Sequence, residues 1–158
     1  MDILTGHLYH IHDSFYDRFP NCNLLYNKGD SFSRPVCVAI QDKTNTDLFW
    51  AVPLSSKIKK YKAIYEKSMD RYGGVCDTLS IAKYAGIESV FLIQNMFPVT
   101  KKYISHLHTI GDSSIPLIKT VSDEISKKAN KLLVLHKAGK TVVFTDIDYI
   151  LNDLLSQN

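Results

Sequence analysis

The chain has 158 residues, the usual size of one domain, and 45% of them are hydrophobic while 22% are charged. This composition excludes a disordered chain, a collagen and a coiled-coil array, and no apolar run approaches the ~20 residues that cross a bilayer. The formal net charge of +3 favours a polyanionic partner only slightly. We therefore expect a single domain over residues 1–158.

Cysteine usage and the first residues of the chain bear on the cellular compartment. Cys22, Cys37 and Cys76 are odd in number and irregularly spaced, which fits neither a disulfide framework nor a paired zinc site. Residues 1–6 lack the basic and apolar regions of a secretory signal. Both features predict a protein of the reducing cytoplasm.

The first third of the chain predicts strands. Residues 8–12 contain a β-branched and an aromatic side chain, which favours a short strand, and residues 13–19 can form a helical turn that Pro20 ends. Residues 35–40 and 48–54 are two further strand signals, separated by a polar cluster that is typical of a turn. We expect these two strands to pair as an antiparallel hairpin.

The middle third predicts one helix and three strands. From residue 55 to residue 72, apolar side chains recur every three or four positions, the spacing of an amphipathic helix, which Gly73 then ends. Residues 78–84 and 89–99 predict two strands around a tight turn. Residues 103–108 predict another strand because aromatic and β-branched side chains dominate there.

The last third predicts two helices. One runs over residues 116–138, with Pro116 in its first turn and Gly139 as its stop. The other follows an N-cap at Thr145 or Asp146. We expect it to bury Ile147, Ile150, Leu151, Leu154 and Leu155. Together these elements predict an α+β domain, a twisted and mainly antiparallel sheet with packed helices.

Histidine pairs are the only metal-like spacing in the sequence. His10 with His12, and His106 with His108, are two residues apart, which places each pair on one face of a strand, but neither pair has an acidic or cysteine partner nearby. The phosphate-binding, zinc-protease and hydrolase motifs GxxxxGK[ST], GxGxxG, HExxH and GxSxG do not occur. We therefore expect neither a metal nor another cofactor.

A cluster of hydroxyls and lysines begins at residue 55. Two serines end the predicted strand, four lysines follow, and no acidic residue occurs before Glu66. Such residues at a helix start suit phosphate oxygens, because the amide groups and dipole there favour anions. A serine N-cap followed by a solvated lysine face explains the same pattern. The residues concerned are Ser55, Ser56, Lys57, Lys59, Lys60 and Lys62.

Four segments carry a resemblance to a known family: LYHI (residues 8–11), RPVCVAI (34–40), AVPLSSK (51–57) and FLIQNMFPV (91–99). In this order, with a long helix beyond, they resemble the RNase toxins of type III toxin–antitoxin systems, the group of ToxN, AbiQ and CptN, with CptN-like toxins as the nearest variant. The resemblance covers nearly the whole chain. It implies a twisted antiparallel sheet similar to that of the MazF and Kid toxins, and a metal-independent endoribonuclease.

The resemblance also implies a partner and a site. The partner is an RNA antitoxin, a repeat that folds into a pseudoknot, which the toxin cuts from a precursor and binds in a closed ring. The family's hydroxyl pair falls on Ser55 and Ser56, and its basic residue on Arg34. The family's lysine falls on Lys57 or Lys59, because this chain lacks the residue, commonly proline, that precedes it in the family.

These residue types suit cleavage of RNA through its own 2′-OH. The attack needs a proton acceptor, a cationic clamp on the phosphorane and a proton donor for the leaving 5′ oxygen. Ser55 and Ser56 can orient the phosphate, while Arg34 with Lys57 or Lys59 supplies the clamp. The general base stays unassigned, and His12 is the only imidazole candidate by sequence order.

Further contacts with RNA are expected from Lys60, Lys62, Tyr61 and Phe32, the last of which matches the family's aromatic position loosely. Aromatic rings among cations can stack on unpaired bases, although the helical spacing of Tyr61 is equally consistent with core packing. An alternative function uses the same basic stretch without catalysis. In that case the chain is an RNA-binding protein in which the serines are helix caps.

Overall fold

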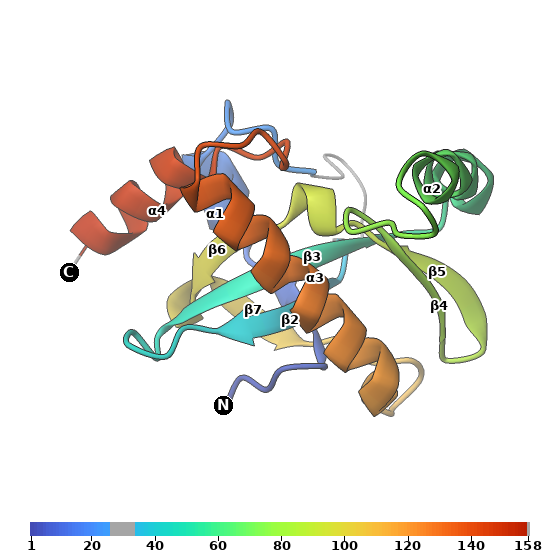
Figure 1. Ribbon diagram of the computed structural model, residues 1–158. Helices are drawn as coiled ribbons and strands as arrows, with labels where there is room; N and C mark the ends of the chain where they lie inside the picture. Colours follow the sequence, from blue (N-terminus) through green and yellow to red (C-terminus); the bar gives the residue numbers. More distant parts are fainter. Residues whose placement is uncertain (26–33, 158) are drawn as a thin grey trace.

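The computed structural model describes residues 1–25 and 34–157, and within them seven strands form one sheet (Figure 1). Its order is β4-β5-β3-β2-β1-β7, with β6 pairing with β3 beside β5, and every pairing is antiparallel. The strands are β1 Leu8–Ile11, β2 Val36–Gln41, β3 Leu48–Ser55, β4 Ser80–Tyr84, β5 Ile87–Phe91, β6 Phe97–Thr100 and β7 Ile104–Leu107.

Helices cover both faces of this sheet. The long helix α3 (Lys119–Lys137) crosses one face, whereas α1 (Asp13–Arg18) and α4 (Ile147–Ser156) lie on the other (Figure 1). Helix α2 (Ile58–Arg71) stands at one end, against the β4–β5 hairpin. The predicted α+β class with a mainly antiparallel sheet is confirmed.

Alternation along the central strands divides the core between the two faces. Val36 and Val38 of β2 face the cluster shared with α1 and α4, while Cys37 and Ala39 face α3. Successive side chains of a strand point to opposite faces, so a strand buried on both faces is apolar throughout. This explains why residues 36–39 are all buried.

The predicted strand over residues 89–99 is wrong as a single element. A short 3₁₀ turn, η1 (Ile93–Asn95), separates β5 from β6. Strand β5 pairs with the end of β3, at Leu54 and Ser55, whereas β6 pairs with its beginning, from Leu48 to Ala51. Because of this turn, one apolar segment pairs with two different parts of β3. Local periodicity cannot predict such a break in a strand.

Two expectations about the helices are also wrong in detail. Helix α3 begins at Lys119 rather than at Pro116, because the Leu117 N–H donates to the Gly6 carbonyl (2.8 Å) and keeps this segment outside the helix. Leu155 is exposed on α4, although Ile147, Ile150 and Leu154 are buried as predicted. Asp146 is the N-cap of α4, and its side chain accepts a hydrogen bond from the Tyr149 N–H.

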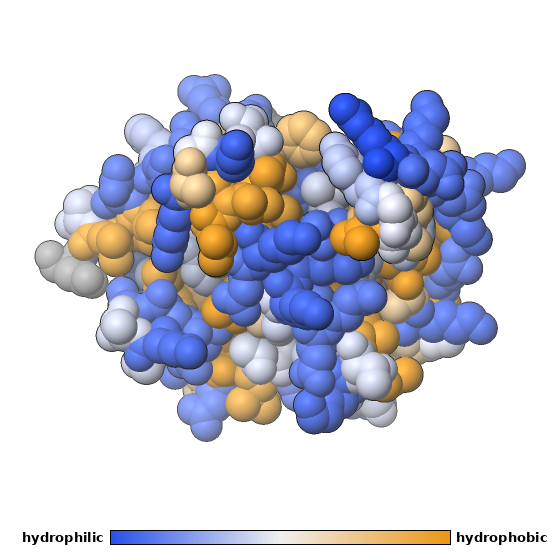
Figure 2. Space-filling view, viewed as in Figure 1, coloured by the Kyte–Doolittle hydropathy of each residue, from blue (hydrophilic) through white to orange (hydrophobic). Residues whose placement is uncertain are grey.

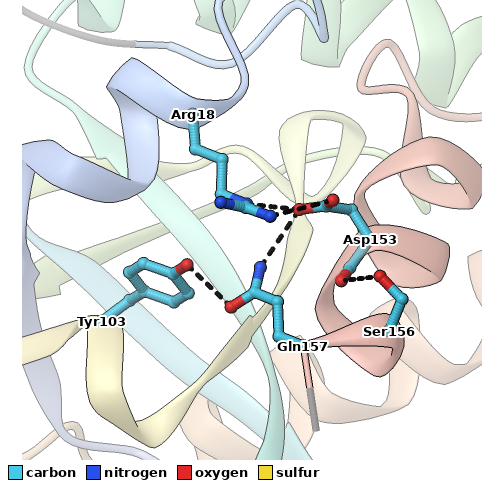
Figure 3. Close-up of polar contacts among 5 residues, drawn as sticks. All are labelled: Arg18, Tyr103, Asp153, Ser156 and Gln157. Atoms are coloured by element: carbon cyan, nitrogen blue, oxygen red, sulfur yellow. Dashed lines mark hydrogen bonds and ion pairs between the residues drawn. The ribbon is translucent and has the colours of Figure 1, made fainter.

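A polar clamp joins α1, α4 and the 3₁₀ turn η2 (Lys101–Tyr103) (Figure 3). Arg18 donates through Nε and Nη2 to the two carboxylate oxygens of Asp153, at 2.5 and 3.1 Å. Gln157 Nε2 donates to the same carboxylate, and the Tyr103 hydroxyl donates to Gln157 Oε1. The guanidinium holds the pKa of Asp153 below its usual range. The clamp thus fixes α4 against the edge of the sheet.

The structure also shows the state of the three cysteines and the length and polarity of the helices. Cys22, Cys37 and Cys76 are free and buried, and burial raises the pKa of Cys37 to about 12. A thiol with so high a pKa carries little thiolate at neutral pH. None of the helices in residues 1–25 and 34–157 is both long and apolar enough to span a bilayer.

Candidate functional site

The candidate site lies where β3 ends beside the start of β2. Pro53 opposes Val36 in the hairpin register, and Ser55, the last residue of β3, pairs with Val90 of β5. The end of β3 is therefore held from both sides by neighbouring strands. This rigid setting suits side chains that must be placed accurately.

Arg34 is brought to this strand end by the hairpin. Its Nη1 donates a 2.7 Å hydrogen bond to the carbonyl of Leu54, twenty residues further along the chain. The half-buried guanidinium charge consequently stands beside Ser55. The structure thus brings together Arg34 and the hydroxyl pair, which the sequence placed in one site through family resemblance.

The two serines differ in what their hydroxyls do. Ser55 is 6% exposed, and its Oγ accepts a 3.2 Å hydrogen bond from the Lys57 N–H. Ser56 is exposed, and its backbone carbonyl accepts from the Ile58 N–H. Lys57 occupies the N-cap position of α2, without a side-chain cap. Ser55 therefore fixes the turn into α2, while Ser56 is exposed at its surface.

The four lysines surround the start of α2 but have different surroundings. Lys62 Nζ lies 3.6 Å from Glu88, and Lys60 Nζ lies 5.1 Å from the centre of the Tyr61 ring. Within the described chain, the amino groups of Lys57 and Lys59 have no hydrogen bond or ion pair. All four lysines are exposed. Lys57 and Lys59 are accordingly the two whose amino groups are best disposed toward an outside anion.

The helix start adds to this positive potential. The first turn of α2 contains no acidic residue, and the unpaired amide groups of a helix N-terminus favour negative charge. Figure 2 shows mostly hydrophilic side chains over α2. The strand end and the start of α2 thus form one surface that combines hydroxyl and cationic groups, a chemistry suited to phosphate oxygens.

The sequence predicts RNA contacts for two aromatic residues, Tyr61 and Phe32, and the structure describes only the first. Tyr61 is 9% exposed and packs with Cys76, Leu79, Val90 and Leu92, so its ring is part of the core under α2. Burial of the ring among core side chains, with Lys60 over it, favours core packing of Tyr61 over stacking on a base. Phe32 lies outside the described residues.

Sequence reasoning missed the side chains that join α3 to the start of β4 and to α2. Lys128 of α3 has a side chain only 14% exposed, and its Nζ donates to the Leu79 carbonyl at 2.8 Å while lying over the Tyr65 ring. The buried Ser80 hydroxyl donates to Glu124. The four-residue spacing of Glu124 and Lys128 is a signal for a helix ion pair, but it does not indicate contact with another element.

Three histidines meet across β1 and β7, on the sheet face that carries α3. His10 opposes His106 with stacked rings, and His10 Nε2 lies 2.8 Å from His108 Nδ1, so one of the two nitrogens donates to the other. Tyr84 also approaches His108. No group of three or more His, Cys, Asp or Glu in the described residues is arranged to hold a metal ion.

The histidine cluster predicts acid-sensitive stability. Burial, and then the neighbouring His106, lower the pKa of His108 below its ordinary value of ~6.5. As the pH falls below ~6.5, the unfolded chain binds a proton that the folded protein resists, so stability is lost toward lower pH. We expect His108→Gln to flatten the fall in Tm between pH 7.5 and pH 5, measured by calorimetry. His12→Gln, at an exposed position, should leave the curve unchanged. Equal curves for wild type and His108→Gln would contradict the prediction.

His12 was the only imidazole suggested as a general base. It is exposed and directly follows β1, with its N–H donating to the Tyr103 carbonyl. Because β1 and β2 are antiparallel and Tyr9 pairs with Val36, β1 ends where β2 begins. His12 and Arg34 thus lie at the same end of these two strands.

Comparison by sequence finds no protein-family model and no curated protein that matches the chain. Comparison by structure does find matches. AbiQ, a lactococcal anti-phage endoribonuclease of a type III toxin–antitoxin system, superposes with a TM-score of 0.72 and 15% identity, covering 98% of this chain and 100% of AbiQ. The chain therefore has the fold of that protein, as the resemblance predicted.

Two further structures share this fold. One, from a bacterial antiviral system regulated by a processed non-coding RNA, matches with a TM-score of 0.65 and 14% identity over 92% of this chain and 95% of its own. The other, from a bacterial type III toxin–antitoxin system in which a non-coding RNA pseudoknot selectively inhibits the toxin, matches with a TM-score of 0.59 and 18% identity. The match covers 82% of this chain and 79% of the chain in that structure.

Proposed function

We propose that this chain is an endoribonuclease toxin of a type III toxin–antitoxin system, active in the cytoplasm and restrained by an RNA antitoxin. The observation that carries the proposal is the convergence of two hydroxyls, an arginine and a lysine-rich helix start at the end of β3. The fold shared with AbiQ supports the assignment, because AbiQ is an anti-phage endoribonuclease. A role in phage defence follows from the same likeness.

The proposed reaction is a sequence-selective transesterification within the RNA chain. The ribose 2′-OH gives its proton to a general base, still unassigned, as its oxygen attacks the adjacent phosphorus; the bond from phosphorus to the 5′ oxygen breaks, and that oxygen takes up a proton from a general acid. The products are a 2′,3′-cyclic phosphate and a 5′-hydroxyl. Arg34 with Lys57 or Lys59 would stabilise the phosphorane charge, while Ser55 and Ser56 would orient the phosphate. Lys60 and Lys62 would attract the RNA chain electrostatically.

The proposed regulation uses RNA as the antitoxin. The toxin would process its own repeat precursor and then bind the resulting pseudoknot in a closed toxin–RNA ring. Its support is that one structure of this fold belongs to a system in which an RNA pseudoknot inhibits the toxin. Expression of the gene with and without the DNA upstream of it, where a repeat RNA is expected, followed by mapping of RNA ends, tests the proposal. Growth arrest with new RNA ends, both suppressed by the repeat RNA, is expected. RNA binding without any new ends would favour a non-catalytic RNA-binding protein.

The reaction chemistry has its own test. We expect cleavage by the purified protein to proceed at an unchanged rate in excess EDTA, because the nucleophile is the substrate's 2′-OH rather than a metal-activated water. The 5′ ends should accept a labelled phosphate from a kinase without prior phosphatase treatment, and mass spectrometry should find the cyclic phosphate. Cleavage that EDTA stops and magnesium restores, or products with a 5′-phosphate, would overturn the proposed chemistry.

A further inference from the structure

One phenylalanine stands apart from the others in the described chain. Phe144, in the segment between α3 and α4, is 63% exposed, whereas Phe15, Phe19, Phe49, Phe91 and Phe97 are all 2% exposed or less. A large apolar ring left in water gives up the free energy that burial would provide. A single exposed apolar side chain is ordinary in a protein, so how Phe144 is held and what surrounds it decide whether the ring has a role.

The backbone that carries Phe144 is firmly held. Its N–H donates to the Gln94 carbonyl at 2.9 Å, and its own carbonyl accepts from Asn23 Nδ2 at 3.1 Å. The next residue, Thr145, is buried, and its hydroxyl donates to the Met96 carbonyl. Asp146 N–H donates to the Cys22 carbonyl. The ring is thus exposed to solvent on a backbone segment that hydrogen bonds hold in place, and not at a frayed end.

Backbone hydrogen bonds link the segment that carries Phe144 to β3, the strand that ends at the candidate site. Gln94 belongs to η1, and η1 begins directly after Leu92. The Leu92 N–H donates to the Pro53 carbonyl of β3 at 2.9 Å. Ser55 follows two residues after Pro53. In Figure 1 the segment that carries Phe144 lies over η1, and α2 lies beyond η1 on the other side. The segment that carries Phe144 is thus joined through η1 to the strand that ends at Ser55, and α2 starts from the same strand end.

We propose that Phe144 is a stacking platform for an unpaired base of the RNA bound at the candidate site. The inference rests on the proposed function, to which it adds a contact for the base next to the phosphate contacts. Proteins that bind single-stranded RNA combine cations along the backbone with aromatic rings on which bases stack. The exposed lysines of α2 supply the cations, and Phe144 supplies the ring that buried Tyr61 does not offer.

The surface around Phe144 favours an RNA base over a protein partner. Figure 2 shows hydrophobic side chains gathered over the C-terminal half of α3 and the segment after it, facing mostly hydrophilic side chains over α2. Charge distinguishes the two partners: the core of a protein interface is depleted of charged residues, whereas the exposed lysines of α2 match the negative phosphate of a nucleotide whose flat base stacks on Phe144.

The test measures affinity for a 12-nucleotide 2′-O-methyl oligoadenylate, which lacks the free 2′-OH and cannot be cut. Phe144→Ala should weaken binding about 5- to 140-fold, the loss of roughly 1–3 kcal/mol of stacking. The slope of affinity against salt concentration should stay unchanged, because no phosphate contact is lost. Phe144→Trp should bind as well as wild type or better, and Phe144→Leu should bind as poorly as Phe144→Ala.

Tyr72→Ala provides the matched control. Tyr72 is 61% exposed but lies at the far end of α2, about 20 Å along the helix axis from Lys57, so its loss should leave affinity unchanged. Affinity of Phe144→Ala within twofold of wild type overturns the proposal, as does wild-type affinity of Phe144→Leu or an equal loss in Tyr72→Ala. A change in sedimentation of Phe144→Ala with unchanged RNA affinity overturns it in favour of a contact between proteins. Because the probe is not cleavable, these results decide the role of Phe144 even where the wild-type protein proves unable to cut RNA.

Discussion

Replacing Ser56 with alanine is expected to slow RNA cleavage about 10²- to 10³-fold while leaving the protein folded and able to bind its repeat RNA. Ser56 is exposed and lies between the end of β3 and the start of α2. A donor aimed at transition-state charge in an active site contributes to the rate on this scale. The measurement is single-turnover cleavage at saturating RNA, with Tm and RNA affinity recorded on the same samples.

Two other serines separate catalysis from folding. Ser55→Ala removes the acceptor of the Lys57 N–H and is expected to cost about 1 kcal/mol of stability as well as activity. Ser14→Ala, at an exposed position on α1, should change neither. A well-folded Ser56→Ala protein with full activity would eliminate Ser56 from the mechanism. A loss of activity that simply followed a loss of Tm would assign it to folding.

Among the lysines of α2, one is expected to act on the scissile phosphate rather than on binding. We expect alanine at Lys57 or Lys59 to reduce single-turnover cleavage at saturating RNA about 100-fold or more, and affinity only a few-fold. Lys57 is favoured because it directly follows the two serines and its backbone is fixed by Ser55. Lys60 over Tyr61 and Lys62 near Glu88 should affect affinity alone.

The salt dependence of binding gives each lysine a second signature. Each lost phosphate contact should reduce the slope of log affinity against log salt by about 0.7 for a single strand. Arg34→Ala completes the series, and since it also removes the hydrogen bond to the Leu54 carbonyl, its Tm must be measured alongside its activity. Equal small losses of affinity in all four lysine variants, with unchanged cleavage, would identify the cluster as a solvated face with no catalytic member.

Local signals in the sequence determined those parts of the fold that local interactions form. The polar turn after Ile40 predicted the β2–β3 hairpin, and the spacing of Ile58, Tyr61 and Tyr65 predicted α2. Asp146 was a correct N-cap candidate because capping depends on the next three residues only. The serines and lysines were likewise found together, since they are neighbours in the chain.

What the tertiary structure decided depends on contacts between distant residues. One apolar run became β5 and β6 because two parts of β3 pair with it, and Pro116 stayed outside α3 because Leu117 pairs with Gly6. Sequence spacing also gives no information on which exposed aromatic ring lies near the site. Phe144 is linked to β3 through the backbone hydrogen bonds that join the α3–α4 segment to η1 and η1 to β3. Local propensity and periodicity act within a few residues, whereas strand register and helix placement follow from burying two faces of one sheet at once.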